Sequence, residues 1–302
     1  MLVLSMMKTP TQHIVDASFK KAMDALCVQY QSDKALAADP ISIPMTYASA
    51  IDRELASWIA AHLAYGRVGP MLNAIRRLLN PLGSQPAQWL RDCSEMRIKK
   101  ELEPILRGWV WRFHNLEDMM SWLFAWKRMD KSTNYSGIES LLLPQDGSKA
   151  DQRLSILINH MRQTLPQSSG IRFNLPDPLK GAACKRWRMF LRWMVRKNWP
   201  DFGIWEKYPL SELVIPLDTH VHRISRQIGL CCRRTQDARA AREITEALRA
   251  LDPIDPLKYD FAIAHLGILG DCAGKRKQNC KCCPLDSVCY INVLYSRFTC
   301  GA

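Results

Sequence analysis

The chain is short of acidic residues and lacks any long apolar run. Its 302 residues contain 29 Asp+Glu against 42 Lys+Arg, a formal net charge of +13. The apolar opening, residues 2–7, is broken by Ser5, ends at Lys8 and has no small-residue cleavage site. Neither a secretory signal nor a transmembrane span is therefore predicted. The excess of positive charge favours a polyanionic partner over a small metabolite.

Strand-like alternation of apolar and polar residues is almost absent, and no repeat recurs at a fixed period. With 47% hydrophobic residues, the chain can bury a substantial core in one large or two small domains. Apolar residues recur at helical spacing, and Trp58, Trp187 and Trp193 are expected to be core residues. Only Gly170–Asn174 is expected to be extended. The predicted helical faces are Leu55/Trp58/Ile59/His62/Leu63, Met71/Ile75/Leu78/Leu79, Trp187/Phe190/Leu191/Met194 and Val221/Ile224/Ser225/Ile228.

Five of the eleven cysteines fall between residues 272 and 289, which indicates a metal site rather than disulfides. The pattern is Cys272-x7-Cys280-x2-Cys283-x5-Cys289. Four thiolates suit either zinc or a 4Fe-4S cluster. Zinc ribbons usually pair two Cys-x2-Cys knuckles and this chain has one, so the spacing favours 4Fe-4S, with zinc as the alternative. Cys282 could replace one of the four ligands.

Three consecutive cations, Lys275, Arg276 and Lys277, lie between the first two cysteines of this pattern. A loop fixed at both ends loses little entropy on binding, so it is suited to phosphate contacts. The alternative is a solvated run of charge.

A second group of cations lies on a predicted helix over residues 184–196. Lys185, Arg188, Arg192 and Arg196 advance by three, four and four positions and are expected to form a cationic face opposite the apolar one. The preceding Gly181-Ala182-Ala183 could turn the chain so that backbone N–H groups face a phosphate.

The segment Ile215-Pro216-Leu217-Asp218-Thr219-His220 precedes the predicted helix that ends at Gly229. Pro216 favours an extended entry, and Asp218 is suited to cap the helix N-terminus. A capping carboxylate can also be a catalytic group.

Together, the Gly-x-x-x-Lys turn at Gly181–Lys185, the later Pro-Leu-Asp-Thr-His segment and the C-terminal cysteine pattern resemble the helix-hairpin-helix DNA glycosylases, in their endonuclease III and MutY branch. The family's first cysteine gap is one residue shorter. The resemblance covers roughly residues 52–290 and points to a bacterial branch of the family. Ala183 departs from it, because the family has a second glycine there.

The resemblance implies that Lys185 is the nucleophile of a bifunctional enzyme and that Asp218 is the catalytic aspartate. Lys185 could instead be one more phosphate contact. The resemblance also places Tyr65 and Arg67 beside the pocket for a flipped base; otherwise they form a capped helix end with a half-buried tyrosine. Trp109 and Trp111–Phe113 could stack on bases or belong to the core.

The fold implied is all-α and two-lobed. Residues 46–188 would form a central lobe ending in the hairpin, and 1–45 with 189–302 a second lobe carrying Asp218 and the cluster loop 272–289. The activity implied is a DNA glycosylase and abasic-site lyase acting on duplex DNA, in a cytoplasmic, nucleoid-associated monomer. A monofunctional glycosylase using Asp218, a non-catalytic damaged-DNA-binding protein and an RNA-directed enzyme are the alternatives. Gly181, Ala183, Arg188, Arg192 and Lys275–Lys277 would contact the nucleic acid.

Overall fold

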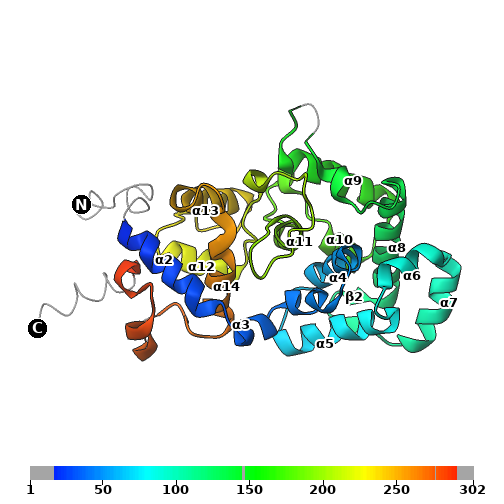
Figure 1. Ribbon diagram of the computed structural model, residues 1–302, viewed down its shortest axis with the longest axis horizontal. Coiled ribbons are helices and arrows are strands. Elements are labelled where there is room, and N and C mark those ends of the chain that lie inside the picture. Colours follow the sequence, from blue (N-terminus) through cyan, green and yellow to red (C-terminus); the bar gives the residue numbers. More distant parts are fainter. Residues whose placement is uncertain (1–16, 145–146, 276, 291–302) are drawn as a thin grey trace, which may run out of the picture. The chain divides into compact units, whose positions relative to one another are not determined.

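The structure, a computed structural model, describes residues 17–144, 147–275 and 277–290, and these are mostly α-helical (Figure 1). In these ranges the only strands are β1 (Val110–Trp111) and β2 (His114–Asn115), which pair as an antiparallel hairpin. No helix there is both long enough and apolar enough to cross a membrane. The predicted all-α class is therefore confirmed.

The chain divides into two compact units. The central unit is Leu36–Leu213, and the terminal unit combines residues up to Ala35 with those from Val214 onward. The sequence placed the second boundary at 188, whereas the structure places it after Leu213. The reason is that α11 (Lys185–Val195) packs along α4 (Ala50–His62) and so belongs wholly to the central unit.

Short helices and turns connect the longer helices in both units. The central unit also contains η2 (Pro40–Ser42), η3 (Pro44–Thr46), α5 (Val68–Leu79), η4 (Asn80–Leu82), α6 (Pro86–Asp92), α7 (Glu95–Ile105), α8 (Leu116–Ser132), η5 (Glu139–Leu142), α9 (Ala150–Thr164), α10 (Ser169–Asn174), η6 (Pro178–Lys180) and η7 (Leu210–Glu212). The terminal unit contains α2 (Ala17–Tyr30), α12 (Thr219–Gln227), α13 (Ala238–Leu251), η8 (Pro256–Tyr259), α14 (Asp260–Ile268), η9 (Gln278–Cys282) and η10 (Asp286–Val288), and α3 (Asp33–Ala37) spans the boundary.

Aromatic rings form the core of the central unit. The Trp58 ring stacks on Trp122 with centroids 4.5 Å apart, and it meets Trp187 and Phe190 edge-on. The indole N–H of Trp58 donates to the Trp122 carbonyl oxygen, so its polar atom is paired although the side chain is fully buried. Trp58, Trp187 and Trp193 are core residues, as their helical spacing predicted.

The segment predicted to be extended is instead helix α10. Ser168 caps it, accepting a hydrogen bond from the Ile171 N–H (3.2 Å). Gly170 lies so close to the hairpin that a Cβ there would be 2.8 Å from the Phe113 carbonyl oxygen. The helix is therefore fixed by a local cap and by a close backbone approach that an apolar-pattern argument does not detect.

The predicted cationic face of α11 is also wrong. The arginines at 188, 192 and 196 are all at most 5% exposed. Arg188 pairs with Asp151, while Arg192 and Arg196 both reach Asp201, at 3.1 and 2.9 Å. Carboxylates from other segments neutralise these charges, so Arg188 and Arg192 are interior residues and not DNA contacts.

The terminal unit is built around α14, which packs against both α2 and α12 (Figure 1). The approach to α12 is close, because a Cβ on Gly267 would lie 2.6 Å from the Cβ of His220. His220 is in the first turn of α12, so the start of that helix is tightly positioned.

Replacing Asp201 with alanine should destabilise the protein strongly, because two arginines would be left buried without their carboxylate. We expect a loss of about 3–5 kcal/mol in the free energy of unfolding, measured by urea denaturation. Glu101→Ala, which breaks the exposed ion pair with Arg97, is the control and should cost less than about 1 kcal/mol. Equal costs would contradict a structural role for this buried ion-pair group.

Candidate functional site

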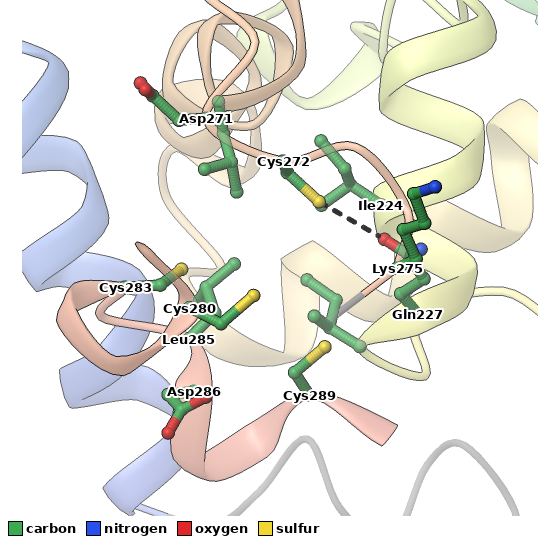
Figure 2. Close-up of a pocket in the computed structure, with 12 residues that line it drawn as sticks. Ile224, Gln227, Asp271, Cys272, Lys275, Cys280, Cys283, Leu285, Asp286 and Cys289 are labelled. Carbon is green, nitrogen blue, oxygen red and sulfur yellow. Dashed lines mark hydrogen bonds between the residues drawn. The ribbon is translucent and has the colours of Figure 1, made fainter. Parts of the chain in front are cut away.

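Four cysteines of the C-terminal motif line one cavity of the terminal unit. Cys272, Cys280, Cys283 and Cys289 border about 460 Å³ of space, part of it open to solvent. Their sulfur atoms surround the same space in the close-up (Figure 2). The apolar part of the lining comes from α12, α14 and the loop itself, through Ile224, Ile228, Leu266 and Leu285.

The thiols are half-buried and affect one another. Burial first, and then the neighbouring Cys272, Cys289 and Cys280, raise the pKa of Cys283. Thiols in such surroundings favour the neutral form until a cation balances them. In the described ranges, no three His, Cys, Asp or Glu side chains are arranged as ligands of a single metal ion.

Helix α12 connects this cavity to the predicted catalytic aspartate. Asp218 caps the helix, its Oδ1 accepting from the Val221 N–H at 2.8 Å, as the sequence predicted. Arg223, further along the same helix, donates from Nη1 to the Cys272 Sγ (3.3 Å) and from Nη2 to the Cys272 carbonyl oxygen (2.8 Å). Gln227 accepts from the same thiol. One helix is therefore capped by Asp218 and contacts a cysteine of the cavity.

The basic loop is attached directly to the cysteine motif. Lys275 lines the cavity, and the Lys277 N–H donates to the Cys280 Sγ at 3.3 Å. Both lysines are exposed. Arg276, the third predicted phosphate contact, lies outside the described residues.

The turn before α11 contains two residues with left-handed backbone. Gly181 has φ +89° and Cys184, the residue before the helix, has φ +53°. Gly181 is exposed and Ala183 half-buried. Lys185 is the first residue of α11 and is half-buried. The turn predicted from Gly181–Ala183 is therefore present in the central unit, whereas Asp218 belongs to the terminal unit.

Tyr65 belongs to a group of rings and cations that we call the Tyr65 cluster: Tyr65, Phe113, Phe173, Arg112 and Arg186. The Phe113 ring lies nearly parallel to that of Tyr65, with centroids 6.0 Å apart, and Phe173 meets Tyr65 edge-on at 4.8 Å. The Arg186 guanidinium lies 3.8 Å from the Phe173 ring centroid. Arg186 also lies 5.7 Å from the Tyr65 ring centroid, and in the sequence it directly follows Lys185.

Buried polar groups lie behind the cluster. The Tyr65 hydroxyl lies 2.6 Å from His114 Nδ1 and donates to the Trp111 carbonyl oxygen at 3.0 Å. Burial lowers the pKa of His114 to about 4 and raises the pKa of Tyr65 to about 12. Both groups are therefore neutral at pH 7, and the charge of the nearby Arg186 lowers the pKa of each. Arg67 is exposed and precedes α5, and Trp109 is core.

Sequence reasoning missed several residues that these sites depend on. Arg223 lies on the helix predicted to end at Gly229, but its partner is a cysteine far away in sequence. Phe173 and Arg186 are near Tyr65 only because α10 and α11 bring them there. The single available indication was the Arg-Phe pair after Trp111, for which both stacking and core roles were open.

The geometry defines a mostly helical protein of two units. Four cysteines surround one cavity, and a separate cluster is aromatic and cationic. The chain belongs to the family described as "Protein of unknown function (DUF2400)", whose model matches residues 39–269. That range includes Tyr65, Lys185 and Asp218 and ends before Cys272. No curated protein and no solved structure matches the chain.

Because His114 is buried, the free energy of unfolding should depend on pH in the acidic range. Its pKa is depressed in the folded state, so its stabilisation is present above the unfolded pKa of about 6.5 and is lost as pH falls toward 4. We expect the stability cost of His114→Gln to shrink by about 2 kcal/mol between pH 7 and pH 5, measured by denaturant unfolding. The exposed His160, changed to Gln, is the control. A cost independent of pH would show that His114 is not held neutral.

Proposed function

We propose that this protein is a DNA glycosylase with abasic-site lyase activity, of the helix-hairpin-helix iron-sulfur kind. The observation that carries the proposal is helix α12, which is capped by Asp218 and holds Cys272 through Arg223 in a cavity bordered by three more cysteines. The Asp218 cap and Cys272 are therefore connected through one helix. The positive charge of +13 supports a polyanionic substrate.

The cavity supports a 4Fe-4S cluster held by Cys272, Cys280, Cys283 and Cys289, with zinc as the alternative. Four thiols are the donors that both groups require. When bound, the cluster supplies structural positioning, since breaking a glycosidic bond requires no electron transfer. Around it, Arg223 balances the charge of a Cys272 thiolate, and the loop presents Lys275 and Lys277 to phosphates.

Asp218 and Lys185 carry the proposed chemistry. The carboxylate stabilises the positive charge that develops on the sugar as the base leaves. The Lys185 amine attacks C1′ as the C1′–N bond breaks and the base departs with the bonding electrons. The two amine protons pass to the departing base and to the ring oxygen O4′ as the C1′–O4′ bond opens, which gives a Schiff base from which elimination cleaves the strand.

The purified protein should carry iron. Prepared without oxygen, it should be brown and contain about four irons and four sulfides per chain. Arg223→Gln should lose iron to a chelator about tenfold faster or more, because a partner of a metal ligand tunes affinity by that amount. Arg226→Gln, an exposed arginine of the same helix, should not change the rate. A colourless protein with one zinc would refute the cluster.

Two substitutions test the catalytic residues. On duplex DNA with one abasic site, borohydride should trap a covalent adduct with the native protein and none with Lys185→Gln. Asp218→Asn should lower base release about a hundredfold or more on duplexes carrying oxidised, alkylated or mismatched bases. Asparagine caps helices as well as aspartate, so stability should hold. Asp237→Asn, the equivalent change at the cap of α13, is the matched control.

Each alternative has its own outcome in these assays. Base release without any adduct would indicate a monofunctional glycosylase that uses Asp218. An adduct that survives Lys185→Gln would make Lys185 a phosphate contact. Binding of the duplex with neither base release nor adduct would indicate a damaged-DNA-binding protein.

A further inference from the structure

The tip of the β1–β2 hairpin exposes an aromatic ring in the central unit. Phe113 is 48% exposed although it touches Tyr65 and Phe173, and Val110 at the start of the hairpin is 60% exposed. Arg112, the residue before Phe113, has φ +52°, a backbone conformation that costs a non-glycine residue free energy. The chain therefore keeps a strained turn that presents a phenyl ring to solvent.

The base of the hairpin is fixed while its tip is exposed. The Trp111 indole donates to the Leu63 carbonyl oxygen at 3.2 Å, and the Trp109 indole to that of Ala74 at 3.0 Å. Asn115 caps α8 in a reciprocal pair with Asp118. The ring is thus held in place before any ligand binds, which lowers the entropy lost on binding.

A cation lies beside the exposed ring. The Arg112 guanidinium lies 5.8 Å from the Phe113 ring centroid and 6.0 Å from that of Tyr65. Arg112 also approaches Gly66, where a Cβ would be 3.2 Å from its Nη1, and the next residue is the exposed Arg67. A ring face beside guanidinium groups suits a ligand that has both a flat π surface and negative charge, which a nucleotide has.

We propose that Phe113 stacks on an unpaired base of a DNA strand, with Arg112 and Arg67 contacting the flanking phosphates. The inference rests on the proposed function for the identity of the polyanion, and it deepens that function by assigning recognition of the unpaired nucleotide to the hairpin. It requires neither Asp218 nor the cysteine cavity, because every contact invoked lies within the central unit.

Binding of two duplexes of one sequence tests the site with the full-length protein. Both contain 2-aminopurine, a fluorescent base, either paired or as a single unpaired nucleotide. The native protein should quench the unpaired 2-aminopurine and bind that duplex about fivefold more tightly or better. Phe113→Ala should lose the quenching and the preference, and Phe113→Trp should keep both. Met96→Ala, at an 80% exposed apolar residue of the same unit, is the control.

Melting temperatures of the variants establish that Phe113→Ala is folded. A folded Phe113→Ala protein that quenches and discriminates as the native protein does would overturn the stacking site, whatever base release shows. If Phe113→Ala weakened binding of both duplexes equally, the stacking site would also be overturned, since a general contact would explain that result. A preference that depends on Phe113, in a protein that releases no base, would support the stacking site and count against the glycosylase.

Discussion

The contact between Arg223 and Cys272 is the interaction on which the candidate site of the terminal unit depends. It joins the C-terminal cysteine loop to α12, and through that helix to Asp218, the residue that caps its N-terminus. Gly267 allows α14 to approach the first turn of α12 closely, so the aspartate is positioned from two sides. A displacement of Cys272 would be transmitted to Asp218 through one short helix rather than through a loop.

The central unit, by contrast, buries charged side chains within an aromatic core. Its buried arginines are each matched by a carboxylate, as Arg192 and Arg196 are by Asp201. Glu54 is buried as well and accepts hydrogen bonds from the Trp126 and Trp205 indoles. Burial of charge is tolerated only where such partners are in place, and Glu54 also links α4 to α8, which is far away in the sequence.

Prediction from sequence worked where the physics is local. Asp218 caps its helix because capping needs only a carboxylate and the next three residues. The helical face around Trp58 was found because apolar spacing of 3.6 residues depends on one segment alone. Prediction failed where a partner lies outside the segment. The sequence of α11 showed cations at helical spacing, but not that Asp151 and Asp201 pair with them in the interior. Helix α10 was missed because Ser168 and Gly170, rather than an apolar pattern, determine it.

The sequence by itself determined the helical class, the Asp218 cap and the spacing of four cysteines, since each follows from residues close together in the chain. Only the tertiary structure decided that the four cysteines border one cavity, that Arg223 holds one of them, and that Phe113 stays exposed among Tyr65 and Phe173. The physical reason is that burial, pairing and stacking depend on which surfaces meet, and the residues that meet here come from helices separated by long stretches of chain.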